Sequence, residues 1–170
     1  PKVGFYGITH YVDHDGMLWI GSSGYGIYKY NYRTEHFNKF PNDASGFFED
    51  EHKNMYFNFR KGASILDIKT NTLLPVIPAS QWQADWENPL VYCRSKNGAL
   101  WLQVSSKKSQ QYRFLKYNTG TQQLEDHSDL LYQGPNGQLL SVFTDAQNNL
   151  WQFYYDTDRS RKFIVADAVT

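Results

Sequence analysis

The chain has 170 residues, 17% of them aromatic, and its 17 basic side chains balance its 17 acidic ones. A chain without net charge has no long-range field to hold a polyanion, so nucleic acid is disfavoured as the main partner. The aromatic content disfavours disorder, and there is no run of about 20 apolar residues, the length that a membrane-spanning helix needs.

Four segments share one pattern: a short apolar strand, a polar turn, and a second strand built on an aromatic residue. The first segment reads ITHYVDHDGMLWIG and has Trp19 as its aromatic. The corresponding aromatics of the later segments are Tyr56, Trp101 and Trp151. We interpret all four as residues that pack between sheets, and not as ligand-stacking groups.

Each segment is followed by a block that alternates apolar and polar side chains and ends in a turn, as a half-buried strand does. These blocks lie at 26–31, 64–70, 113–120 and 162–167. After the first block, His36–Phe40 has the polar character of an edge strand. Each unit therefore holds about four strands.

Units of about 40 to 50 residues with four strands each are typical of a β-propeller, whose blades are small twisted sheets around a channel. The sequence predicts an all-β fold of four blade-like, four-stranded antiparallel units, at about 8–43, 44–78, 89–127 and 137–170. The first turns of three units contain residues that tolerate a positive φ, namely Asp15-Gly16, Asn97-Gly98 and Asn148-Asn149. Lys53-Asn54 in the second unit fits this pattern less well.

The motif Asp-His-Asp-Gly-Met-Leu-Trp-Ile-Gly, followed by Gly-Ile-Tyr-Lys-Tyr-Asn, resembles the two-component regulator propeller repeat. Residues 8–40 match it closely, whereas the second unit has Tyr56 in place of tryptophan and the later units diverge after the Leu-Trp pair. The resemblance implies the periplasmic or otherwise extracytoplasmic sensor region of a bacterial hybrid two-component histidine kinase. Many such sensors respond to products of glycan breakdown. It implies no catalysis and no cofactor within these residues.

Propellers of that family have about seven blades. The resemblance thus favours a piece of a larger propeller, with residues 1–7 as the outer strand of a neighbouring blade. The alternative is that residues 2–6 complete the fourth unit and close a small ring. An open piece exposes strand edges and sheet faces, so we expect it to pair with the remaining blades of its parent chain or with a second copy.

The functional loops of a propeller gather at one end of its blades. Connections between second and third strands carry basic pairs in three of the four units, and a long connection between units two and three adds two tryptophans outside the repeat. We expect this face to bind an oligosaccharide through basic groups and aromatic rings. The candidate residues are Arg60, Lys61, Trp82, Trp86, Lys107, Lys108, Tyr154, Arg159 and Arg161. A solvated polar loop, with Trp82 and Trp86 capping the interface between units, is the alternative.

The sequence predicts no catalytic or metal site. Gly16 and Trp19 have the spacing of a sialidase Asp-box, but His14 stands where its aspartate would be. A glycoside hydrolase needs two carboxylates that face one sugar, whereas the clustered acids fall in turns at the other end of the blades. The five histidines show no metal-ligand spacing, and the single Cys93 is expected in the core.

The sequence is compatible with three functions. A ligand sensor is favoured, a purely structural or dimerisation segment is the first alternative, and a glycan-active propeller enzyme is the second.

Overall fold

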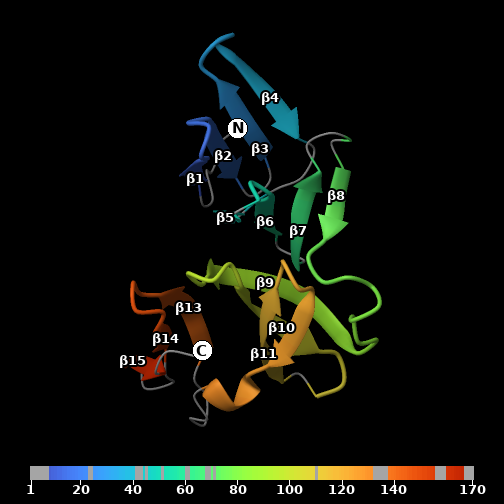
Figure 1. The fold of residues 1–170 in the computed structure, drawn as a ribbon, viewed down its shortest axis with the longest axis vertical. Helices are drawn as coiled ribbons and strands as arrows, with labels where there is room; N and C mark the ends of the chain where they lie inside the picture. The colour runs from blue at the N-terminus through green and yellow to red at the C-terminus, as the bar shows by residue number, and fades with distance from the viewer. Residues whose placement is uncertain are drawn as a thin grey trace, which may run out of the picture. The chain divides into compact units, whose positions relative to one another are not determined.

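The computed structural model describes residues 8–22, 25–40, 44, 46–50, 52–59, 62–67, 70, 72–109, 111–131, 138–155 and 160–166. The chain forms two compact units, Pro1–Ser80 and Gln81–Thr170. Each unit holds two antiparallel sheets whose strands follow one another in chain order (Figure 1). The expected all-β fold of antiparallel sheets is therefore confirmed.

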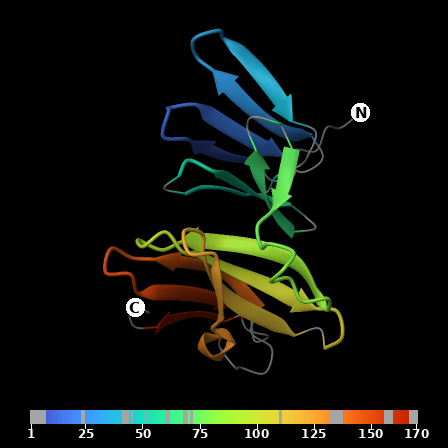
Figure 2. The same ribbon diagram turned by 45° about the vertical axis from the view of Figure 1, so that its right-hand side comes forward.

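The first unit contains two four-stranded sheets, packed face to face (Figure 2). The first sheet consists of β1 (Ile8–Val12), β2 (Leu18–Ser22), β3 (Gly26–Asn31) and β4 (His36–Phe40). The second consists of β5 (Gly46–Glu49), β6 (Met55–Phe59), β7 (Gly62–Asp67) and β8 (Thr72–Pro75). Strand β1 lies against β5, so the two sheets meet along their first strands.

The second unit repeats this arrangement, with β9 against β13. The third sheet consists of β9 (Trp86–Arg94), β10 (Leu100–Ser106), β11 (Tyr112–Asn118) and β12 (Gln123–Asp126). A short 3-10 helix, Ser128–Leu130, leads to the fourth sheet, which consists of β13 (Gln138–Thr144), β14 (Leu150–Tyr155) and β15 (Arg161–Ala166). Within the described residues the fourth sheet has three strands and no outer fourth strand. Residues 1–7, expected as an outer strand, lie outside the described ranges.

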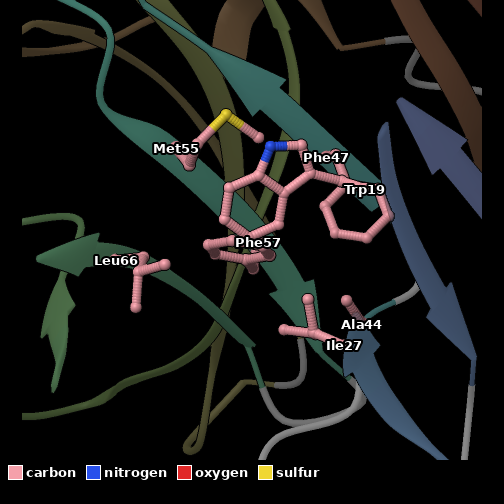
Figure 3. Packing of buried hydrophobic residues seen from close by; sticks show 7 residues of the cluster. All are labelled: Trp19, Ile27, Ala44, Phe47, Met55, Phe57 and Leu66. Atoms are coloured by element: carbon pink, nitrogen blue, oxygen red, sulfur yellow. The ribbon is translucent and has the colours of Figure 1, made fainter. Parts of the chain in front are cut away.

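The core of the first unit lies between its two sheets (Figure 3). Trp19 and Ile27 from the first sheet pack against residues of the second sheet and of the segment before it, namely Ala44, Phe47, Met55, Phe57 and Leu66. The Trp19 ring stacks on Phe40 at 5.5 Å and meets Phe57 edge-on at 5.5 Å. An aromatic ring buries about 150–250 Å², which makes Trp19 the largest apolar contribution to this core.

The third and fourth sheets bury a second core, in which Cys93, Trp101 and Phe114 meet Val142 and Leu150. Trp101 stacks on Phe114 at 5.1 Å. Of the four repeat aromatics, Trp19, Tyr56 and Trp101 are buried. Trp151 is half-buried and stacks on Phe143 at 6.0 Å.

One turn geometry closes the first hairpin of every sheet. The residue that opens the turn accepts a backbone hydrogen bond from the third residue after it and donates one to the fourth. The third residue has a positive φ in each case: Gly16 at 77°, Lys53 at 67°, Gly98 at 85° and Asn148 at 67°. The expectation of a positive φ is thus confirmed for Gly16, Gly98 and Asn148, and Lys53 adopts it despite its side chain.

The carboxylates that open three of these turns bind both the turn and the repeat aromatic. Asp13 accepts from the backbone N–H groups of Asp15 and Met17 and from Trp19 Nε1 at 2.8 Å. Asp50 and Asp145 make the same backbone bonds and accept from Tyr56 Oη at 2.9 Å and from Trp151 Nε1 at 2.9 Å. In the third sheet Ser95 opens the turn, and its hydroxyl donates to the carbonyl of Ala99.

Candidate ligand-binding surface

The structure joins two of the segments to which the sequence assigned ligand binding. Residues 81–85 precede β9, and residues 107–109 follow β10, whose last residue pairs with Trp86. The Lys107 N–H donates to the Asp85 carbonyl at 2.7 Å, and Lys107 Nζ donates to the Ala84 carbonyl at 3.1 Å. We call residues 81–86 and 106–109 the Trp82 surface.

Two tryptophans form the apolar part of this surface. The rings of Trp82 and Trp86 meet edge-on, with centroids 5.8 Å apart and planes at 90°. Trp86 is only 5% exposed, and it is the first residue of β9 instead of part of a connection as the sequence indicated. Trp82 is half-buried, so its ring is the one with surface left for a ligand.

The Trp82 surface carries both positively and negatively charged side chains. Lys108 is exposed, whereas Lys107 fixes the Ala84 carbonyl. Asp85 adds a carboxylate, whose Oδ2 accepts from the Ser106 hydroxyl at 3.2 Å. A half-buried ring flanked by hydrogen-bonding groups of both signs suits a hydroxyl-rich ligand better than a highly charged one.

Of the remaining candidates, the structure describes Tyr154 and Arg161, which lie on the fourth sheet. Arg60, Lys61 and Arg159 lie outside the described residues. Tyr154 lies within β14, is 2% exposed and donates its hydroxyl to Gln152 Oε1 at 2.5 Å, so its ring presents no face to a ligand. Arg161 is exposed at the first position of β15, in register with Tyr155.

Near the first hairpin turns, side chains link the two sheets of each unit. In the first unit Glu49 Oε2 accepts from the His14 N–H at 2.9 Å and from the Tyr11 hydroxyl at 3.4 Å. In the second unit the Thr144 hydroxyl donates to the Arg94 carbonyl at 3.0 Å, and the Lys96 N–H donates to Asn148 Oδ1 at 3.2 Å. We call these two contact regions seams. The sequence interpretation did not find them.

The surroundings of Asp13 and of Cys93 shift the pKa values of these two groups. Burial raises the pKa of Asp13, but hydrogen bonds from Trp19 and Met17 and the nearby Lys29 outweigh it, so the pKa lies below 3.8. Burial raises the pKa of the Cys93 thiol to about 12, which leaves it protonated and unreactive at neutral pH.

Among the residues that the structure describes, no group of three or more His, Cys, Asp or Glu side chains is arranged to hold a metal ion. Within the same residues no helix has the length and apolar character of a membrane span.

The fold resembles that of a solved extracellular domain from Bacteroides. No family model matches the chain, and no curated protein matches it in sequence. The chain superposes on the extracellular domain of BT4673 from B. thetaiotaomicron, which is assigned to a hybrid two-component system. The TM-score is 0.55, and the identity is 14% over 95% of this chain and 28% of that one. The corresponding domain of BT3049 from the same organism gives a TM-score of 0.45 and 15% identity over 97% of this chain and 30% of that one. This chain spans less than a third of either structure.

Proposed function

We propose that this chain is a ligand-sensing part of the extracytoplasmic region of a hybrid two-component system, and that its sheets are blades of a larger β-propeller. The observation that carries the proposal is the fold similarity, at a TM-score of 0.55 over 95% of the chain, to an extracellular domain assigned to such a system. The repeat motif resembles that of propeller sensors independently of this similarity.

The stacking of the sheets supports the propeller. Within each unit, consecutive sheets pack face to face and meet along their first strands, β1 with β5 and β9 with β13. In a propeller, the first strand of every blade lies nearest the axis and the last strand lies at the rim. The exposed β4 has the character of a rim strand.

Apolar outer faces support the presence of further sheets in the parent protein. On the face of the first sheet opposite Trp19, Leu18 is in register with Val12 and Tyr30, and Tyr30 with Phe37, which is 56% exposed. On the face of the fourth sheet opposite Leu150, Phe153 pairs with Phe163, which is 65% exposed. Patches of this kind mark surfaces that meet another protein layer, and further blades of the same repeat would cover them.

The Trp82 surface is the proposed sensing site, and an oligosaccharide is the proposed ligand. The ring of Trp82 offers an apolar face for a sugar ring, while Lys108 and Asp85 offer a donor and an acceptor for its hydroxyl groups. Ligand binding would act on the rest of the sheet through the start of β9, because Trp86 is the first residue of β9 and its ring contacts Trp82.

Calorimetric titration with a panel of neutral and acidic oligosaccharides tests the sensing site. We expect Trp82→Ala to weaken binding at least about fivefold, the effect of losing about 1 kcal/mol of ring contact. Arg33→Ala, at the exposed β3–β4 turn, is the matched control and should leave binding unchanged. A ligand that binds Trp82→Ala as tightly as the natural chain would refute this site.

A structural or dimerisation role is the second candidate, because the exposed apolar faces also suit a second copy of the chain. Absence of binding to every sugar of the panel, together with a dimer in light scattering, would favour this role. Release of shortened products from the panel would instead indicate an enzyme.

A further inference from the structure

One packing arrangement joins the two sheets of each unit. In the first unit Trp19, a repeat aromatic, packs against Met55 and Phe57, which stand on either side of the repeat aromatic of the second sheet. In the second unit Trp101 packs against Leu150, which stands just before the repeat aromatic of the fourth sheet. In both units the face that carries the repeat aromatic of the earlier sheet thus meets the opposite kind of face on the later sheet. We call the first kind the aromatic face of a sheet and the second kind its flanking face.

The first and fourth sheets each have a second face that the other sheet of the unit does not cover. On the flanking face of the first sheet, Leu18 is in register with Val12, which is 55% exposed. On the aromatic face of the fourth sheet, Trp151 is in register with Phe143 and Val165, which are both 45% exposed. Within the described residues, these two sheets therefore present one exposed face of each kind.

The side chains at the hairpin edge of these two faces fit each other. In the seam of the first unit, Tyr11 of the aromatic face donates its hydroxyl to Glu49 of the flanking face at 3.4 Å. Phe143 stands in the place of Tyr11, because each is in register with the repeat aromatic of its sheet. Val12 stands in the place of Glu49, because each is in register with the residue before that aromatic. The hydroxyl and the carboxylate are thus both absent, and two apolar side chains take their places.

The adjoining turn follows the same pattern. His14, whose ring bonds to Glu49, comes directly after the residue that opens its turn, and Ala146 holds that position in the fourth sheet. Replacing both partners of a polar contact by apolar groups can be nearly neutral, whereas removing one partner leaves a buried polar group unsatisfied. Val12 therefore matches Phe143 and Ala146. The flanking face of the first sheet suits the aromatic face of the fourth better than one with polar groups at these positions.

We propose that two copies of the chain associate head to tail, with the aromatic face of the fourth sheet of one copy on the flanking face of the first sheet of the other. Trp151 then packs on Leu18 and Ile20, which flank the repeat aromatic of the first sheet, and Phe143 packs on Val12. The contact joins unlike faces, so a pair keeps one face of each kind, through which a further copy can bind. The proposal does not rest on the sensor role, and the Trp82 surface lies on neither of these sheets. Where further blades of the repeat belong to the same chain, they would cover these faces instead of a second copy.

Sedimentation equilibrium of the 170-residue chain over a range of concentrations tests this proposal. We expect the average mass to rise with concentration above that of one chain. Val12→Lys and Phe143→Lys should each weaken the association at least about tenfold, because either lysine places an unpaired charge in the contact. An equal mixture of the two variants should associate again and stop at two chains, because it retains one unaltered pair of faces. Tyr112→Lys, which changes a 54% exposed side chain of the third sheet, is the matched control and should associate as the natural chain does.

Three results would overturn the proposal. One is the mass of a single chain for the natural protein at every concentration. Another is undiminished association of either lysine variant in a sample whose circular dichroism spectrum is that of the natural chain, since the copies would then meet through other faces. The third is a mixture of the two variants that stays monomeric, because a head-to-tail contact must be restored in it. None of these results bears on the sugar titration, which tests the Trp82 surface separately.

Discussion

Replacing Asp13 by asparagine should destabilise the first unit through the turn that closes its first hairpin. The Asp13 carboxylate is buried, and its Oδ2 accepts from Trp19 Nε1 at 2.8 Å and lies 3.2 Å from Lys29 Nζ. Its Oδ1 accepts from two backbone N–H groups. Asparagine has one acceptor oxygen, so whichever way its amide turns, an NH₂ group faces a donor.

The size of the loss follows from these contacts. A hydrogen bond to a charged group contributes about 1.5–3 kcal/mol, and a buried donor left without an acceptor costs about 1–3 kcal/mol. Because the two effects share one site and are not additive, we expect Asp13→Asn to lower the free energy of unfolding by about 2–4 kcal/mol. Asp145→Asn is the matched control. Its turn is the same, but its carboxylate is more exposed, and Val165 pairs with Trp151 where Lys29 pairs with Trp19, so its loss should be smaller.

Urea unfolding followed by fluorine NMR of fluorotryptophan measures the free energy of unfolding of both variants. Trp19 is the one tryptophan in residues 1–80, and Trp151 reports on the fourth sheet. A loss below about 0.5 kcal/mol for Asp13→Asn would refute the reasoning, as would a loss no larger than that of Asp145→Asn. The pH dependence gives a second check. Since the folded pKa of Asp13 lies below its unfolded value of 3.8, its stabilisation is complete above that pH and is lost as the pH falls through the folded pKa. The difference between Asp13→Asn and the natural chain should therefore shrink in acid.

Three further outcomes follow from the backbone and the core. Lys53 has a φ of 67°, so Lys53→Gly should raise the urea midpoint by removing about 1 kcal/mol of strain, whereas Lys53→Ala should not; equal midpoints would contradict this. A Cβ at Gly21 would lie 2.7 Å from Phe47 Cζ and 2.9 Å from the Ala44 carbonyl, so Gly21→Ala should cost about 1–3 kcal/mol in the same assay, and an unchanged midpoint would argue against this packing. Burial raises the pKa of Cys93 to about 12, so a thiol reagent at pH 8 should react only after urea unfolds the chain; rapid reaction with the folded protein would show that the thiol is accessible.

The strands and first turns could be predicted because their determinants are local. The alternating blocks became β3, β7, β11 and β15, and the turn residues at Gly16 and Gly98 adopt the positive φ that glycine tolerates. In three of the four units an acidic residue stands six positions before the repeat aromatic. Its cause, a carboxylate that accepts the indole N–H, required the side-chain geometry.

Contacts between sheets could not be predicted in the same way. Glu49 and His14 meet although 35 residues separate them, and nothing in either segment indicates the other. In β14 both faces carry aromatic residues, so alternation could not tell that Tyr154 is buried with Leu150 while Phe153 faces outward. Trp86 was assigned to a connection because it lies outside the repeat, but pairing with Ser106 draws it into β9.

The closure of each first turn by hydrogen bonds within its own residues has a consequence for the order of folding. Contacts between residues close in sequence form quickly, and a hairpin takes about 1–10 μs to form. The bond from Asp13 to Trp19 spans six residues, whereas the bond from Glu49 to His14 spans 35. We therefore expect each hairpin to form before neighbouring sheets dock, with the repeat aromatic already hydrogen-bonded to its turn carboxylate in the first, second and fourth sheets. Assembly would then proceed by adding preformed hairpins one after another along the chain.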